Sequence, residues 1–352
     1  MSELLTHGGD WAGFLSERGK LPLDFSASIS PLGVPGGVRA AVRQAAGQMD
    51  RYPDLLCRAL RESISEYELV PPQQILCGNG AAELIFRVVW ALRPRQALVT
   101  APTFSEYGAA LQSVGCAVKT WSLPEKRDFR LEEGVLDAIT PETDLVFLCE
   151  PNNPTGVTAG RPLLLQILRR CRETGTRLVL DECFGDLLDD PESHTLKGEL
   201  EAYPNLLILK AFTKLYAMAG IRLGYALCAD RALLERMYLA GQPWSVSVPA
   251  QAAGAAALRE TAYRERVRSL VRRERPCLAK RLGTLGLRVV PGEANYLLFQ
   301  SPVSLGEPLA RRGILLRSCD NYIGLDETWY RTAVRTRRQN QRLVEALEEI
   351  VK

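Results

Sequence analysis

The chain has 352 residues, of which 46% are hydrophobic and 24% are charged. A chain of this length and composition can bury a large core, and it is long enough for two domains. Its 44 basic and 41 acidic residues leave a formal charge of only +3, and no basic tract indicates a nucleic acid or an anionic membrane as partner. The composition therefore favours a protein that acts on small molecules.

Cysteine and histidine usage narrows the chemistry further. The nine cysteines include no C-x-x-C pair, which favours reduced thiols over disulfides or a zinc site. Only His7 and His194 occur, and neither lies in a metal-binding or Ser-His-Asp motif, so we expect no metal. No apolar run approaches the roughly 18 residues of a membrane span, and residues 1–11 lack the features of a signal peptide. We expect a cytoplasmic protein that does not bind membranes.

Short apolar runs alternate with helical stretches through the middle of the chain. Turn-forming residues dominate 24–33 and predict an arm over the site or over a partner, with a mobile tail as the alternative. Strands are predicted over 97–101, 144–149, 177–181, 206–209 and 223–228, with a helix over 162–173. This alternation implies a mostly parallel sheet covered by helices on both faces.

The pattern changes after about residue 245. A long charged helix is predicted over 263–285, strands near 287–290 and 296–299, and a closing helix over 337–351. We therefore divide the chain into an amino-terminal arm (1–35), a large α/β domain (36–245) and a smaller α+β domain (246–352).

Motifs with side chains that can bind ligands or react follow several of the predicted strands, where ligands of open α/β sheets bind. The sequence PNNPTG (151–156) follows one strand and DECF (181–184) ends the next, while GNGAAE (78–83) precedes a helix whose first amides can bind a phosphate. Lys214 and Arg222 lie eight residues apart. A desolvated lysine can attack an aldehyde, and arginine presents a rigid fork to a phosphate. Taken alone, each of these segments is equally well a turn or a surface loop.

Together, the segments occur in an order that resembles the fold type I pyridoxal phosphate (PLP) enzymes of the aminotransferase class I/II superfamily, over nearly the whole chain. The resemblance implies a large domain with a mostly parallel central sheet, a smaller α+β carboxy-terminal domain, and PLP as the cofactor. In this pattern Lys214 holds the cofactor as a Schiff base. Asp181 pairs with the pyridine nitrogen and Asn153 bonds the phenolic oxygen. The aromatic ring that stacks on the cofactor is Phe104.

The same resemblance assigns residues to the cofactor phosphate and to a partner subunit. The phosphate ligands are Gly80, Ala81, Ala82, Thr213 and Arg222. Tyr52, in the sequence RYPD, resembles a residue that reaches the cofactor phosphate of the neighbouring subunit, which implies a homodimer with shared active sites.

Arg331, in the sequence YRTAVR, matches the position that clamps the substrate carboxylate. Arg335 follows closely, and the motif position favours Arg331.

Within the superfamily the chain is most similar to the histidinol-phosphate aminotransferase branch, and inside it to the threonine-phosphate decarboxylases of cobalamin biosynthesis. Three features support this resemblance: His7 followed by two glycines, Arg317 in the loop RSCDNYIGLD, and Phe184 where aminotransferases usually have a tyrosine. His7 and Arg317 then bind the substrate phosphate. The implied reaction is decarboxylation of L-threonine O-3-phosphate to (R)-1-aminopropan-2-ol O-2-phosphate, with transamination of histidinol phosphate or a related amino acid as the alternative.

Two positions depart from the family pattern. Ala211 stands where a phosphate-binding Ser or Thr is usual, which leaves more of that task to Thr213 and Arg222. Ser30 replaces an asparagine before Pro31, so its contact with the substrate phosphate is expected to be shorter or water-mediated. A PLP-binding regulator without turnover is the reading from another class, but the chain has no appended basic helix-turn-helix segment. His7 alone also fits a structural role.

Overall fold

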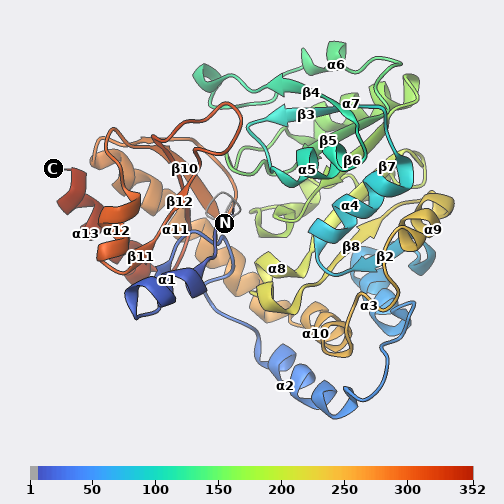
Figure 1. Cartoon of the computed structure of the whole chain (residues 1–352), viewed down its shortest axis with the longest axis horizontal. Helices are drawn as coiled ribbons and strands as arrows, with labels where there is room; N and C mark the ends of the chain where they lie inside the picture. Colours follow the sequence, from blue (N-terminus) through green and yellow to red (C-terminus); the bar gives the residue numbers. More distant parts are fainter. Residues whose placement is uncertain (1–6, 352) are drawn as a thin grey trace.

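The computed structural model describes residues 7–351. Within them, a seven-stranded sheet has the order β2-β8-β7-β6-β5-β3-β4, and all of its strands except the edge strand β4 are buried apolar runs (Figure 1). The strands are β2 (Ile75–Gly78), β3 (Gln96–Ala101), β4 (Ala117–Ser122), β5 (Leu145–Cys149), β6 (Arg177–Asp181), β7 (Leu206–Ala211) and β8 (Gly224–Leu227). Neighbours are parallel except around β8, which is antiparallel to both β2 and β7. The predicted mostly parallel sheet is confirmed.

Helices cover both faces of this sheet, because successive residues of a strand point to opposite faces. In β5, Leu145 and Phe147 belong to the hydrophobic cluster with α4, α5 and α9, whereas Val146 and Leu148 belong to the cluster with α3, α7 and α10. The sequences of strands that are buried on both faces are therefore continuous apolar runs. The helices of this part are α2 (Gly36–Ala45), α3 (Arg58–Glu68), α4 (Ala81–Leu92), α5 (Glu106–Gln112), α6 (Val135–Ala138), α7 (Arg161–Glu173), α8 (Phe212–Leu215), α9 (Arg231–Leu239) and α10 (Val248–Leu258).

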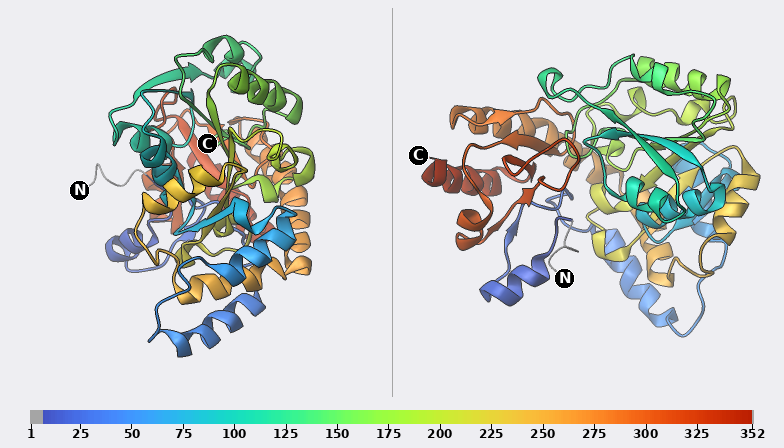
Figure 2. Two further views of the ribbon diagram at one scale, coloured as in Figure 1. Left: turned by 90° about the vertical axis from the view of Figure 1, so that its right-hand side faces the viewer. Right: turned by 45° about the horizontal axis from the view of Figure 1, so that its top comes forward.

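A second, four-stranded antiparallel sheet has the order β12-β13-β10-β9 (Figure 2). Its strands are β9 (Arg288–Val289), β10 (Tyr296–Gln300), β12 (Arg317–Ser318) and β13 (Trp329–Ala333), and the helices beside it are α11 (Thr261–Thr284), α12 (Gly306–Arg311) and α13 (Arg337–Val351). Leu278 and Leu282 of α11 and Leu343 and Leu347 of α13 share one buried cluster with β10. The predicted charged helix and closing helix are both confirmed.

The amino-terminal segment lies with the smaller sheet. Helix α1 (Trp11–Arg18) is followed by β1 (Leu23–Asp24), which pairs in parallel with β11 (Ile314–Leu315). Phe25 is fully buried in the same cluster as α13, and Figures 1 and 2 both show α1 beside this part of the molecule. Helix α10, in contrast, packs on α2 and α3. The division at residues 35 and 245 remains a proposal.

Within residues 7–351 no helix combines the length and the apolar character that crossing a bilayer requires.

Candidate active site

A cavity of about 140 Å³ lies where β5, β6 and β7 end. It is lined by Ala81, Ala82, Ile85, Phe104, Cys149, Asn153, Asp181, Cys183, Phe184, Ala211, Thr213, Lys214 and Arg222. The structure thus brings together eight of the residues predicted to contact a cofactor, from Ala81 to Arg222. They converge because the carboxyl ends of parallel strands meet at one edge of a sheet.

Lys214 lies on α8, the short helix that begins directly after β7. Its Nζ atom is 5.0 Å from the centre of the Phe184 ring. Burial, reinforced by the positive charge of Arg331, lowers the pKa of Lys214 to about 8. A larger share of this amine is therefore neutral near physiological pH than for an exposed lysine, as a nucleophile requires.

Asp181 ends β6 and is held by two donors. Its Oδ2 atom accepts a hydrogen bond of 2.6 Å from the Tyr107 hydroxyl, and its Oδ1 accepts one of 2.9 Å from the Cys183 amide. The Tyr107 ring stacks on Phe147 with centroids 4.9 Å apart. Burial and the nearby Asp181 charge raise the pKa of Tyr107 well above its usual value. Its hydroxyl therefore keeps its proton and donates a hydrogen bond to the carboxylate.

The role of Tyr107 was missed by the sequence reasoning. A signal was present, because Tyr107 follows Phe104 by three residues at the start of a helix, where side chains at this spacing are neighbours. The two rings do meet edge to face, with centroids 5.6 Å apart.

The opposite end of the cavity is positively polarised. Helix α4 begins at Ala81, and its first amides have no partner within the helix. Gly80 precedes it with φ +83°, and a Cβ atom there would come within 2.7 Å of Nη2 of Arg222. Glycine at this position therefore lets the guanidinium lie against the helix N-terminus, an arrangement that favours a phosphate. A cationic end, a carboxylate end and Phe104 suit a flat pyridine ring that carries a phosphate.

Two arginines lie on neighbouring strands of the smaller sheet, and one of them contacts the cavity lining. Arg331 on β13 lies directly opposite Arg317 on β12, so both side chains project from the same face. One Nη of Arg331 donates to Oδ1 of Asn153, which lines the cavity, and the other donates to the Ser26 carbonyl oxygen at 3.0 Å. Nη2 of Arg317 donates to Oδ1 of Asn321 at 2.7 Å.

Arg335 is placed differently. Its Nη1 donates to the backbone carbonyl oxygen of Asp24 at 2.6 Å, and its guanidinium lies 5.9 Å from the Phe25 ring. It therefore ties the amino-terminal segment to the smaller sheet.

Six predicted residues are not part of the lining of the cavity: Gly80, Arg317 and Arg331, described above, and His7, Ser30 and Tyr52. Nε2 of the half-exposed His7 is 2.9 Å from Oε1 of Glu106, and its ring is 5.9 Å from that of Phe104. The hydroxyl of Ser30 is buried against the hydroxyl of Tyr263 at 2.7 Å, and the Ser30 amide donates to the Lys214 carbonyl oxygen at 2.8 Å.

Tyr52 is the last of these residues, and it does not line the cavity of its own chain. It is 80% exposed and stacks on Trp244 with ring centroids 4.6 Å apart.

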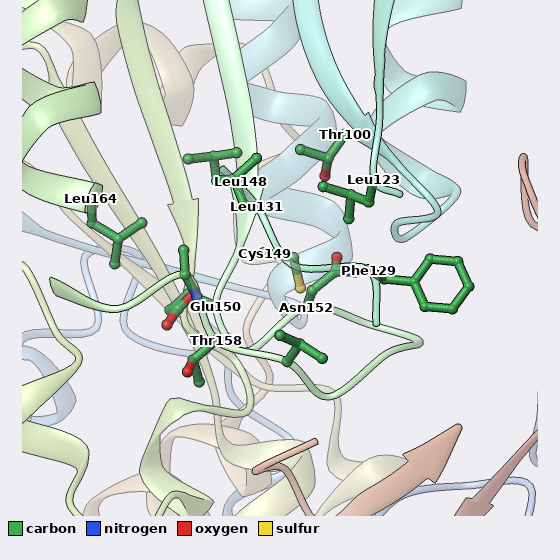
Figure 3. A pocket seen from close by; sticks show the side chains of 12 residues that line it. Thr100, Leu123, Phe129, Leu131, Leu148, Cys149, Glu150, Asn152, Thr158 and Leu164 are labelled. Carbon is green, nitrogen blue, oxygen red and sulfur yellow. The ribbon is translucent and has the colours of Figure 1, made fainter. Parts of the chain in front are cut away.

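A second cavity lies on the other side of Cys149 (Figure 3), between β5 and the loop that follows it. Its wall includes Glu150 and Asn152, but its volume is only about 20 Å³, which is room for about one water molecule. It is too small for a substrate, so the candidate active site is the larger cavity at Lys214.

Comparison with known proteins agrees with this geometry. The family model of aminotransferase class I and II matches residues 23–347. The chain is 40% identical to the threonine-phosphate decarboxylase of Salmonella typhimurium, over 98% of this chain and 96% of that protein. It is 35% identical to the histidinol-phosphate aminotransferase of Symbiobacterium thermophilum, over 91% of this chain and 88% of that protein.

The fold is shared with a solved structure of histidinol-phosphate aminotransferase from Sinorhizobium meliloti in complex with pyridoxal-5'-phosphate. The TM-score is 0.88 at 23% identity, and the match covers 99% of this chain and 96% of that one. The chain therefore belongs to the aminotransferase class I and II family of enzymes, and its cofactor is pyridoxal phosphate.

Proposed function

We propose that this enzyme decarboxylates L-threonine O-3-phosphate to (R)-1-aminopropan-2-ol O-2-phosphate, as a step of cobalamin biosynthesis. The observation that carries the proposal is the pairing of Arg317 and Arg331 on neighbouring strands, with Arg331 bonded to Asn153 of the cavity lining. Two guanidinium groups suit a short substrate with two anionic ends, a carboxylate and a phosphate. Histidinol phosphate has only the phosphate. The 40% identity to a threonine-phosphate decarboxylase supports the same reaction.

The residues around the cavity would hold the cofactor as follows. Lys214 would bind its aldehyde carbon, and Asp181 its pyridine nitrogen. Since Oδ1 of Asn153 already accepts from Arg331, its amide N–H groups are left to donate to the phenolic oxygen. Phe104 would stack on the ring, while Gly80, Ala81, Ala82, Thr213 and Arg222 would hold the phosphate. When bound, PLP withdraws electrons from the α-carbon of the amino acid attached to it.

The protein's own part in the reaction is orientation and proton transfer. Arg331 would hold the substrate carboxylate, and Arg317 with His7 would hold the substrate phosphate. A short substrate fixed at both ends cannot rotate about its Cα–N bond, so the angle at which the carboxylate is held decides whether carbon dioxide or a proton leaves the α-carbon. With a pKa of about 8, Nζ of Lys214 can then deliver a proton to that carbon.

Phe184 is consistent with the proposed roles of the cofactor and of the residues around it. It contacts Tyr296 edge to face, with centroids 4.9 Å apart, and presents no hydroxyl to the cavity beside Lys214.

Product identity is the decisive test. Purified enzyme is incubated with L-threonine O-3-phosphate without any keto acid, and separately with histidinol phosphate and 2-oxoglutarate. We expect carbon dioxide from the first mixture and little glutamate from the second. Rapid glutamate formation with no carbon dioxide would overturn the decarboxylase and leave the aminotransferase, which the 35% identity to a histidinol-phosphate aminotransferase makes the second candidate.

We further propose a homodimer with shared active sites. The support is the position of Tyr52, which is 80% exposed and is not part of the cavity lining of its own chain. The cytoplasmic location stays a prediction.

A further inference from the structure

A small cavity away from the active site brings two cysteines together. Its volume is about 40 Å³, and its wall includes Cys57, Cys77, Arg61 and Arg87. Cys57 directly precedes α3, Cys77 lies on β2, and the helix packs on that strand. Both thiols are 6% exposed and belong to the same hydrophobic cluster. The cavity has room for a molecule of about two or three waters, which is the size of a small oxidant.

The surroundings make the two thiols unequal. Cys57 stands at the N-terminus of α3, and Arg61 follows one turn later. Arg87 is almost completely buried and its Nε atom has no hydrogen-bond partner. A helix N-terminus and two guanidinium groups are surroundings in which a cysteine becomes reactive.

The thiols also interact with each other. A hydrogen bond from Cys77 lowers the pKa of Cys57, and the charges of Arg61 and Arg87 act in the same direction. The same hydrogen bond, together with burial, raises the pKa of Cys77 well above its usual value. Cys57 is thus the more acidic thiol of the pair, and Cys77 is the thiol that holds its proton more strongly.

We propose that Cys57 and Cys77 form a redox pair that closes to a disulfide when a peroxide enters this cavity. The Cys57 thiolate attacks one peroxide oxygen, and the O–O bond breaks as the S–O bond forms, which converts Cys57 to a sulfenic acid. The other oxygen takes a proton and leaves as water. The sulfur of Cys77 then attacks the Cys57 sulfur and releases the second water. One peroxide is reduced to two waters, and two thiols are oxidised to one disulfide.

The bond would act close to the cofactor. Cys77 is followed directly by Gly78, Asn79 and Gly80, the loop ahead of α4. Glu83 accepts from the Asn79 amide at 2.6 Å and from Arg87 at 2.8 Å, so this loop and the cysteine cavity share one hydrogen-bond network.

The test uses the enzyme with its cofactor bound. It is treated with hydrogen peroxide, denatured in the presence of an alkylating agent that blocks the remaining thiols, and digested with trypsin. Cys57 falls in the tryptic peptide 52–58 and Cys77 in the peptide 62–87, each with a single cysteine. We expect these two peptides to appear joined, and the free thiols of the denatured protein to fall from nine to seven (9 − 2).

Variants separate the roles of the two cysteines. Cys77→Ser should stop at the sulfenic acid on Cys57, which dimedone traps, and Cys57→Ser should leave Cys77 unmodified. Cys171→Ser, on α7 and outside this cavity, is the matched control and should keep the joined peptides. The proposal is overturned if wild-type enzyme, after losing thiols to peroxide, yields the peptides 52–58 and 62–87 separately with both cysteines alkylated. Because this outcome is measured on wild-type enzyme, it tests the proposal even if a variant fails to fold.

Discussion

In its proposed role, Lys214 faces two opposing requirements: it must be neutral to attack the cofactor, whereas a free lysine is protonated at physiological pH. Burial and the charge of Arg331 resolve this by lowering its pKa to about 8 from an ordinary 10.5. The like charge of Arg331 disfavours the protonated amine, so the proposed substrate clamp and the proposed nucleophile are coupled.

This coupling predicts a pH profile. The rate at which apoenzyme attaches PLP should rise as pH increases through about 8, since the neutral amine is the reactive form. In Arg331→Met the midpoint should move to higher pH, because the repelling charge is gone. Rapid-mixing absorption spectroscopy from pH 6.5 to 10 measures both, with Lys214→Ala as the blank. A midpoint that is the same in both proteins would contradict the assigned coupling.

Tyr107 predicts a stability difference between two matched hydroxyl deletions. Tyr107→Phe removes a buried donor to the charged Asp181 and should lower the free energy of unfolding of the apoprotein by about 1.5–3 kcal/mol. Tyr296→Phe removes a neutral bond to the Asn152 carbonyl oxygen, which still accepts from the Gly156 amide, and should cost about 0.5–1.5 kcal/mol. Urea denaturation compares the two. Equal losses would mean that the bond to Asp181 carries no charge-assisted strength.

At the scale of elements, the best predictions fall where one physical signal dominates. Strand β6 and helix α13 have the predicted bounds, because the first is a short continuous apolar run and the second carries regularly spaced apolar residues. Strand β4 was missed, since it lies at the edge of the sheet and has no buried residue. The antiparallel direction of β8 could not be predicted from periodicity, which is the same for either direction.

The candidate site was predictable to the extent that its residues lie in motifs. The cluster from Ala81 to Arg222 assembles because each motif follows a strand of one sheet. The bond between Tyr107 and Asp181 joins residues 74 apart in sequence, and that between Tyr263 and Ser30 joins residues 233 apart. Such pairings depend on how helices pack on the finished sheet, about which local patterns carry no information.

A buried cation links three elements behind the active site. Lys210 on β7 is 3.4 Å from Glu68 on α3, 3.6 Å from Glu182 and 3.1 Å from Asp186. Burial raises the pKa of Glu182 to about 7. The network therefore brings one buried lysine close to three carboxylates.

Removing that lysine should be costly, and more so at alkaline pH. Lys210→Met removes the cation beside the buried Glu182, whereas Glu68 keeps Lys197 at 3.3 Å, and should lower the free energy of unfolding by about 3–5 kcal/mol at pH 8. A carboxyl whose pKa is raised on folding stabilises the folded state while it is protonated and loses that contribution as pH rises through about 7. The deficit should therefore shrink at pH 5.5.

Lys280→Met, at an exposed position of α11, is the control and should stay within about 0.5 kcal/mol. Chemical denaturation of both variants at pH 5.5 and 8 measures the difference. A Lys210→Met deficit that grows on acidification would contradict the assigned network.

At the scale of the whole molecule, the segment from Leu23 to Ser30 joins the two sheets. It pairs with β11 at one end, and at the other the Ser30 amide donates to the Lys214 carbonyl oxygen. Between them, the Ser26 carbonyl oxygen accepts from Arg331. Arg331 and Lys214, the proposed substrate clamp and the proposed nucleophile, are thus connected through one backbone segment.

The exposed apolar surface around Tyr52 supports the proposed dimer. Met49, Leu55, Leu56 and Trp244 are exposed close to it in sequence or, for Trp244, in direct contact. Apolar side chains gathered on a surface in this way are typical of an interface.

Mixed dimers test whether a second subunit completes the site. Wild-type subunits are combined with subunits that carry both Tyr52→Phe and Lys214→Ala, each with its own affinity tag. In the purified mixed dimer the single site with a native Lys214 then lacks the hydroxyl of its neighbour. A hydrogen bond to a phosphate contributes about 1.5–3 kcal/mol, so the Kd for PLP at that site should rise by about tenfold or more. The matched control pairs wild type with Lys214→Ala alone, where the hydroxyl is kept and the Kd should equal that of the wild type. Absorption titration measures both, and equal affinities in the two mixed dimers would mean that Tyr52 acts within its own chain or not at all.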